Sequence, residues 1–175
     1  GITVSGFVPA VGFGLQGFWQ ETVAPNIPYQ FDQATMPVIM TYDPGTTAFH
    51  VQRAVWLDRQ VGTETTNPDP TFIGNPITDV STFQGRLVFL AGKNVIMTRT
   101  NRELDWWIGS ASAITDSDPI DISSTAVEAS VMIAMVPHNR DLTVHSPNGQ
   151  FVIFGRTALT PANAALVLTT AFEAD

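Results

Sequence analysis

The chain of 175 residues has no cysteine, a single lysine and few charged residues, and each shortage excludes something. Without cysteine, neither a disulfide framework nor a thiolate metal site can form. Charged residues make up 14% of the chain, whereas an average protein has about a quarter. This low fraction indicates a surface partly buried against neighbours. No apolar run is long enough to span a bilayer, so we expect no membrane insertion by this segment.

The charges that are present are mostly negative. Sixteen acidic residues stand against eight basic ones, a net charge of −8. Tight binding to a phosphate backbone needs a basic patch, so this balance argues against it. All basic residues except Lys93 are arginines, which suit fixed, planar ion pairs at interfaces.

Length and chain ends suggest one domain taken from a longer protein. A chain of this size can bury one sizeable core. It starts at Gly1 without an initiator methionine and ends at Asp175 without a stop pattern, so we expect a piece of a longer subunit. We divide it into an apolar, glycine-rich lead segment (1–18), a hairpin with a proline-rich loop (19–82) and a propeller-like meander (83–175).

The clearest strand signal lies between Phe83 and Thr100. Two β-rich runs, Leu87 to Ala91 and Val95 to Arg99, flank a short turn at Gly92, Lys93 and Asn94, which predicts an antiparallel hairpin. The aromatic stretch around Trp106 and Trp107 reads as a further short strand. Three such strands make a meander, as in one blade of a β-propeller, and an ordinary hairpin in a sandwich fits the pattern equally well.

Other runs predict more hairpins. Val38 to Tyr42 and Ala48 to Val51 flank the turn Asp43-Pro44-Gly45-Thr46. Leu142 to His145 and Phe151 to Phe154 flank Pro147-Asn148-Gly149, whose Asn-Gly pair predicts a type I′ turn. The run from Ser124 to Val136 mixes helix and strand formers, and we favour a strand closed by Pro137. The expected fold is all-β, with antiparallel hairpins, a meander and β-propeller-like blades, or else a sandwich or barrel.

Residues with possible chemistry are few. Asp116, Asp118 and Asp121 could offer oxygen ligands to calcium, but the Gly and later Glu of a calcium loop are missing, and Asp commonly caps turns. The histidines at 50, 138 and 145 lack the paired spacing of a zinc site. Gly12-Phe13-Gly14, followed by Gly17, has the spacing of a dinucleotide loop, but a short glycine pattern of this kind is by itself a negligible signal. We predict no catalytic, cofactor-binding or metal-binding residues.

The order of several short stretches along the chain carries more information than any one of them. They are Trp19-Gln-Glu-Thr22, Phe31-Asp-Gln-Ala-Thr-Met-Pro37, Trp56-Leu-Asp-Arg59, Gly62, Thr66-Asn-Pro68, Phe72-Ile-Gly74, Ile77-Thr-Asp79, Arg86-Leu87, Asn94-Val-Ile-Met97, Asp116-Ser-Asp-Pro-Ile-Asp121 and Gln150-Phe151. Their order resembles the tail tubular protein B, or nozzle, family of short-tailed (T7-like) bacteriophages. The resemblance runs from Trp19 to Glu173. Val38-Ile39 depart from it, because a more polar continuation is expected there.

The resemblance implies a structural role without enzymatic activity. Nozzle proteins form a hexameric ring below the adaptor ring of the portal and carry the DNA exit channel with β-propeller-like domains. The implied partners are identical subunits, the adaptor ring and tail fibres, with genomic DNA passing through without tight binding. The implied location is the virion tail, after assembly in the host cytoplasm. An acidic wall suits such a conduit, since it does not hold DNA.

A carbohydrate-binding or glycoside-cleaving β-domain of a phage tail is the alternative. It requires Trp106 or Trp107 exposed over a groove, or two facing carboxylates such as Asp105 and Asp116. We predict instead that Trp56, Trp106 and Trp107 are core or inter-blade packing residues, because burial is the commoner use of large aromatic side chains.

Overall fold

Four consecutive strands near the middle of the chain form the first sheet. The computed structural model describes residues 7–8, 18–125 and 131–171. Within it, the first sheet is an antiparallel meander in chain order. Its strands are β5 (Ile77–Phe83), β6 (Arg86–Ala91), β7 (Asn94–Met97) and β8 (Ile120–Ser123).

The central strands of this sheet are buried on both faces, which explains their nearly continuous apolar sequence. Successive side chains of a strand point to opposite faces. Val88 and Leu90 of β6 therefore face one core, while Phe89 and Ala91 face another. Gly92, at φ 57°, opens the turn to β7.

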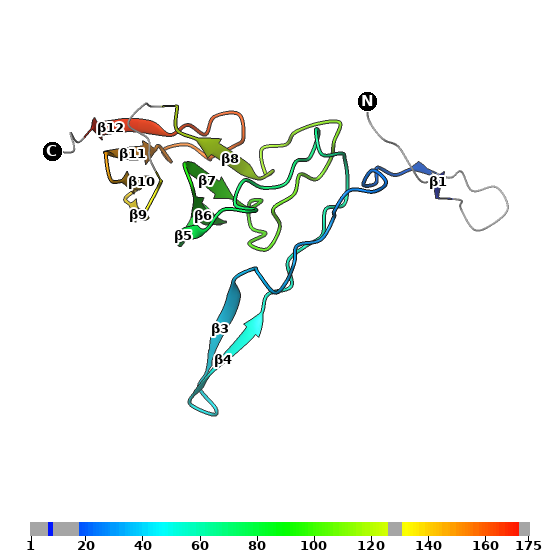
Figure 1. The fold of residues 1–175 in the computed structure, drawn as a ribbon, viewed down its shortest axis with the longest axis horizontal. Coiled ribbons are helices and arrows are strands. Elements are labelled where there is room, and N and C mark those ends of the chain that lie inside the picture. Colours follow the sequence, from blue (N-terminus) through cyan, green and yellow to red (C-terminus); the bar gives the residue numbers. More distant parts are fainter. Residues whose placement is uncertain (1–6, 9–17, 126–130, 172–175) are drawn as a thin grey trace.

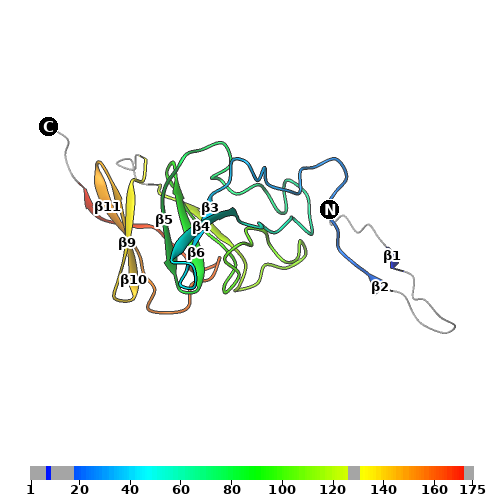
Figure 2. The same cartoon turned by 90° about the horizontal axis from the view of Figure 1, so that it is seen from below.

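The second sheet follows the first and packs against it (Figure 2). Its strands are β9 (Ala134–His138), β10 (Asp141–Ser146), β11 (Gly149–Ile153) and β12 (Val167–Ala171), again antiparallel and in chain order. The core between the sheets comes from both. It contains Phe83, Val88, Leu90, Val95, Met97, Ile120, Met132, Met135, Leu142, Val144, Phe151, Ile153 and Leu159.

A second core covers the other face of the first sheet, and loops rather than strands supply most of it. Trp56, Trp106 and Trp107 are each no more than 5% exposed there, which confirms that they are packing residues. Trp106 lies against Phe89 of β6, with ring centroids 4.5 Å apart. The other buried members are Phe31, Met36, Ala54, Phe72, Ala91 and Ile96.

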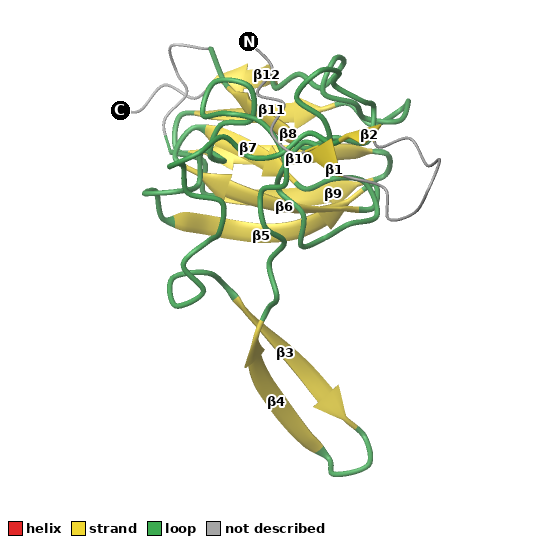
Figure 3. Cartoon of the chain, turned by 90° about the vertical axis from the view of Figure 1, so that its right-hand side faces the viewer, coloured by secondary structure: helices red, strands yellow, loops and turns green. Residues whose placement is uncertain are grey.

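Two small hairpins stand apart from the sheets. Among the described strands, β3 (Val38–Asp43) and β4 (Ala48–Arg53) pair only with each other, and they project from the body (Figures 1 and 3). We call this hairpin the arm. β1 (Phe7–Val8) pairs with β2 (Phe18–Trp19). Most of the predicted lead segment, and residues 126–130 of the ambiguous run, lie outside the described residues.

The all-β prediction is confirmed, since every described element is a strand and all the sheets are antiparallel. The predicted hairpins at Leu87–Arg99 and Val38–Val51 are also present, as β6–β7 and β3–β4. The third strand of the first meander was predicted wrongly. It is β8, beginning at Ile120, and the aromatic stretch at Trp106 is a loop that packs on the sheet.

Two local predictions need correction. Pro137 does not close its strand but lies inside β9, opposite Leu142. Proline is tolerated there because β9 is the edge of its sheet. The β10–β11 turn is not type I′: Ser146 pairs with Gly149, so the loop is Pro147-Asn148. A type I′ turn needs positive φ at both loop residues, which proline cannot adopt.

Candidate assembly surface

Asp43 holds the turn at the tip of the arm. Its carboxylate accepts one hydrogen bond from the Thr46 hydroxyl and one from the Gly45 amide, both at 2.8 Å. These two bonds, the hydroxyl's first, hold the pKa of Asp43 below its ordinary value of 3.8. Thr47, at φ 52°, takes the left-handed position in the turn. The sequence prediction of a tight turn here is therefore correct, with the strain at Thr47 rather than Gly45.

The strand register gives the arm two chemically different faces. Cross-strand partners point to the same side of a sheet. Because Met40 pairs with Val51 and Tyr42 with Phe49, these side chains share one face, together with Val38. We call these five residues the apolar face of the arm.

The opposite face of the arm is mostly polar. Thr41 pairs with His50 on this side, and His50 Nε2 lies 3.9 Å from Asp43 Oδ2. Near the root of the arm this face also carries Ile39, which is partly buried against the second core. At the root of the arm the polar face therefore contacts the body through Ile39, whereas Thr41 and His50 farther out are exposed.

Every residue of the apolar face is more than half exposed. The exposed fractions are 57% for Val38, 64% for Met40, 54% for Tyr42, 65% for Phe49 and 63% for Val51. The Tyr42 and Phe49 rings pack together near the tip, with centroids 5.2 Å apart. An isolated two-stranded hairpin is marginally stable in water, so an uncovered apolar face of this kind indicates a docking surface.

An apolar hollow of about 420 Å³ lies at the foot of the arm. Met36 and Pro37, which lead into β3, form part of its wall, and the loop before β5 forms the rest. None of the described residues that line it is charged, and Ile73 on its rim is 45% exposed. The hollow is lined by Thr35, Met36, Pro37, Phe72, Ile73, Gly74, Asn75, Pro76 and Ile77.

Of the three aspartates weighed as metal ligands, Asp116 is exposed, and the side chains of Asp118 and Asp121 make other contacts. Asp118 is fully buried, and its carboxylate accepts hydrogen bonds from the Thr115 and Gly109 amides, at 2.7 and 3.0 Å. Asp121 accepts bonds from Thr71 and Asn94 instead. These contacts are the turn-capping and loop-tethering roles that aspartate commonly has.

Arg86 holds the Asp116–Asp118 turn through hydrogen bonds to its backbone. It is 1% exposed and donates hydrogen bonds to backbone carbonyls of Thr98, Asp116, Asp118 and Leu159, at 2.6 to 3.2 Å. Burial lowers the pKa of Arg86, and the charge of Asp118 opposes that shift. One guanidinium therefore joins the first sheet to the Asp116–Asp118 turn and to the loop that carries Leu159.

Asp105 is held by arginines and is not a free acid facing Asp116. Its carboxylate lies 3.2 Å from Arg102 and 3.5 Å from Arg99, and it accepts a bond from the Trp107 amide. Arg99 also reaches Asp118, at 3.4 Å. These contacts, with the burial of Trp106 and Trp107, leave the carbohydrate alternative without the exposed platform that it requires.

The predicted histidine and glycine candidates are scattered. His50 is on the arm, His138 ends β9 and His145 is in β10. Among the residues described, no three His, Asp or Glu side chains gather as ligands of a metal ion would. Gly12-Phe13-Gly14 lies outside the described residues. The prediction that the chain has no metal or cofactor site stays a prediction.

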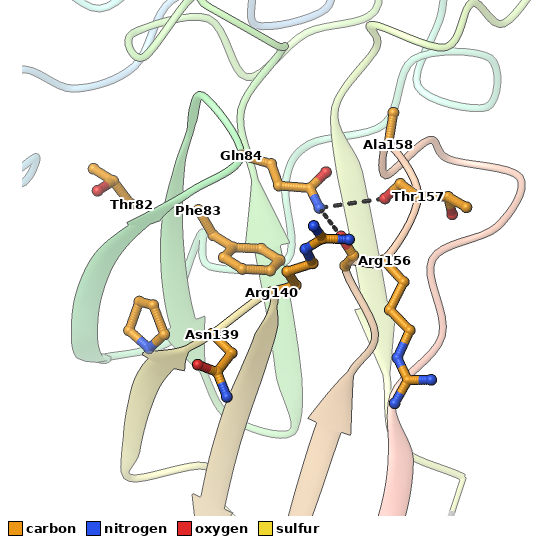
Figure 4. A pocket seen from close by; sticks show the side chains of 10 residues that line it. Thr82, Phe83, Gln84, Asn139, Arg140, Arg156, Thr157 and Ala158 are labelled. Atoms are coloured by element: carbon orange, nitrogen blue, oxygen red, sulfur yellow. Dashed lines mark hydrogen bonds between the residues drawn. The ribbon is translucent and has the colours of Figure 1, made fainter.

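A second hollow, of about 510 Å³, opens at one end of the two sheets (Figure 4). Gln84 spans it, donating from Nε2 to the carbonyl of Gly155 at 2.8 Å and accepting from the Leu159 amide at 2.9 Å. Arg140 and Arg156 are exposed on its rim. Its best-defined contacts join β5–β6 to the end of β11, so we read it as a structural junction.

Sequence reasoning found the arm as a hairpin but did not show that its apolar face is uncovered. The signal was present, because apolar residues occupy alternate positions in Val38-Ile-Met-Thr-Tyr42 and Phe49-His-Val51. Such alternation normally predicts a face packed on the protein's own core. Only the structure shows that this face points away from the body.

Comparison with known proteins agrees with the resemblance described above. Residues 10–175 match the family of the bacteriophage nozzle protein. The chain is also similar to the tail tubular protein gp12 of Escherichia phage T7, with 32% identity over 155 residues, 89% of this chain. It spans only 19% of the length of that relative. In the described residues, no helix has the length and apolar character that crossing a membrane takes. The chain belongs to the bacteriophage nozzle protein family, a family of structural phage-tail proteins.

Proposed function

We propose that this chain forms part of the wall of the DNA exit channel, within a subunit that assembles as a ring below the portal and adaptor rings. The observation that carries the proposal is the family match over residues 10–175. The ring is taken to be a hexamer, touching the adaptor ring and tail fibres. It would be located in the virion tail and assembled in the host cytoplasm.

The surface chemistry is compatible with a conduit. The chain carries a net charge of −8, and double-stranded DNA is densely negative, so the two repel rather than bind. A wall with that property lets DNA slide past without being held. Subunits of a ring also cover part of each other, which suits the low charged fraction of 14% and the uncovered arm.

The sheets support the further proposal that they are blades of a propeller-like domain. Each is a four-stranded antiparallel meander, and they pack face to face. The outer face of the second sheet carries a cross-strand row of Val136, Thr143, Val152 and Val167. Val136 is 52% and Val167 40% exposed, so this row could pack against another sheet of the longer subunit.

The test is the assembly state of the full-length protein. We expect a closed ring by light scattering and negative-stain microscopy, either alone or once the purified adaptor ring presents a template. The 175-residue piece alone should be monomeric or weakly associated, because most of its interface is missing. A full-length protein that stays monomeric with the adaptor ring present would refute the ring.

A further inference from the structure

We infer that the apolar face of the arm docks on a second copy of the same chain, in the uncharged hollow at the foot of that copy's arm. The inference rests on the proposed ring and names the contact that closes it. The two surfaces are the apolar face (Val38, Met40, Tyr42, Phe49, Val51) and the hollow that includes Met36 and Ile73.

The first argument is area. Half-exposed side chains of this size each present on the order of 100 Å², so the face offers about 500 Å² in one patch. That is near the upper limit of what a monomeric protein leaves exposed. It is also more than half of the ~800 Å² that each partner contributes to a standard interface. The arm alone therefore supplies a large share of a stable contact.

The second argument is direction. The arm projects from the body, and no other strand in the described ranges pairs with it (Figures 1 and 3). Ile39, on the opposite face, is the arm residue packed against the second core. The two faces of a hairpin point in opposite directions. At the root of the arm, where Ile39 contacts the second core, the apolar face therefore points away from the body of its own chain.

The third argument identifies the partner. Copies of a chain with net charge −8 repel each other, so they associate best through surfaces without acidic groups. Within the described part of the chain, no residue that lines the hollow is charged. On the apolar face the only charged neighbour is Arg53, which pairs with Val38 at the root. Both surfaces are thus uncharged or slightly basic on an acidic protein.

The geometry of a ring also favours a second copy of the chain as the partner of the arm. A contact between two different patches of identical subunits is heterologous, and it closes into a ring when the rotation between subunits allows. Each copy carries both an arm and a hollow, and these lie close together in sequence, since Pro37 lines the hollow and Val38 begins the arm. Every subunit can therefore give one arm and receive another.

The experiment compares two glutamate substitutions on neighbouring residues of β3 in the full-length protein. Met40→Glu places a charge on the apolar face, whereas Thr41→Glu places the same charge on the polar face of the same strand. We expect Met40→Glu to raise the protein concentration needed for ring assembly at least tenfold, and Thr41→Glu to leave it nearly unchanged. Unaltered tryptophan emission and thermal melting show that both variants are folded.

Crosslinking tests whether the arm docks in the hollow of another copy. The 175 residues contain no cysteine, so a full-length variant with Met40→Cys and Ile73→Cys should form a ladder of covalent oligomers on mild oxidation. The single variants and the unmodified full-length protein should not form this ladder. Crosslinking by Met40→Cys alone would mean that arms meet arms, which would overturn the inference. So would the absence of any ladder from the double variant.

Failure of this inference and failure of the proposed function give different results. If the unmodified full-length protein forms no ring even with the adaptor ring, the proposed function fails. If it forms a ring that Met40→Glu does not weaken, the proposed function stands and the docking contact is wrong. Equal loss with both glutamate variants also overturns the contact, because the effect would not be specific to the apolar face.

Discussion

Single residues in this chain show how a buried charge can organise turns instead of catalysing a reaction. Arg86 is a strand-initiating residue in the sequence, with nothing to distinguish it from Arg99. In the structure it is buried and bound to four backbone carbonyls from three different segments. Its five donors in a fixed plane make arginine the residue that can satisfy so many acceptors at once.

Replacing Arg86 should strongly lower the stability of the folded chain. We expect Arg86→Met to lower the free energy of unfolding by about 3–5 kcal/mol, because it leaves several buried carbonyls without donors. The matched change Arg102→Met removes an exposed arginine whose ion pair with Asp105 should be worth no more than about 1 kcal/mol. Urea denaturation followed by tryptophan emission measures both. Equal, small losses would show that Arg86 is not an organising residue.

Asp43 gives a prediction about pH. Its pKa is lowered in the folded arm by the Thr46 hydroxyl and the Gly45 amide. A lowered pKa means that the carboxylate stabilises the turn above pH 3.8, and that this contribution is lost as pH falls through the folded-state value. An NMR titration of the Gly45 amide should therefore have its midpoint below 3.8. The Asp43→Asn variant should show no such transition, and a midpoint above 3.8 in the original chain would contradict the prediction.

At the scale of elements, the two sheets depend on close contacts at their junction. Gly155 follows β11, donates to Asp141 at 3.0 Å and accepts from Gln84 at 2.8 Å. A Cβ at this position would overlap the backbone carbonyl oxygen of Arg140 and lie 2.6 Å from both Gln84 Nε2 and Phe83 Cζ. Only glycine allows the chain to pass so close to the β5–β6 and β9–β10 turns.

A methyl group at Gly155 should therefore strain the junction. We expect Gly155→Ala to destabilise the protein by about 1–3 kcal/mol, as overpacking in a well-packed region does. Gly45→Ala is the control, since its Cβ would meet only the movable carboxylate of Asp43, at 3.2 Å. That change should stay within about 0.5 kcal/mol. Thermal melts of the two variants would contradict the assignment if Gly155→Ala behaved like the control.

At the scale of the whole molecule, charge and assembly are linked. The body buries two cores, one between the sheets and one on the outer face of the first sheet. Among the apolar surfaces that remain uncovered are the apolar face of the arm and part of the row on the second sheet, where Val136 and Val167 are exposed. In the proposed ring both surfaces would be covered, and none of the residues named for them is acidic.

The acidic balance predicts that this chain does not hold DNA. In gel-shift experiments with duplex DNA at about 0.15 M salt, we expect no complex at micromolar protein, because a chain of net charge −8 releases few counterions from DNA. Lowering the salt should not produce a complex either. Binding that weakens in proportion to the logarithm of the salt concentration would reveal a basic track and contradict the conduit proposal.

The sequence by itself determined the fold class, most hairpins and the family. Alternating or continuous apolar runs between Gly, Pro, Asn and Asp turns act locally, and they placed β3, β4, β6, β7, β10 and β11. The same local rules predicted a type I′ turn at Asn148-Gly149 and a strand at Trp106, and both were wrong. In the first case the pairing of β10 with β11 makes Pro147-Asn148 the loop. In the second, the Trp106 and Trp107 side chains pack in the second core and their segment is a loop.

Only the tertiary structure decided which apolar face is inside. The patterns of β6 and of the arm both read as core-forming, yet Leu90 is fully buried while Met40 is 64% exposed. A strand is buried only where other elements pack on its faces. For β6, strands β9–β11 cover one face and loops distant in sequence cover the other. The arm has no such partner within the described chain, because its root turns the polar face toward the body. The candidate assembly surface is therefore a property of the arrangement of elements and could not be read from local sequence.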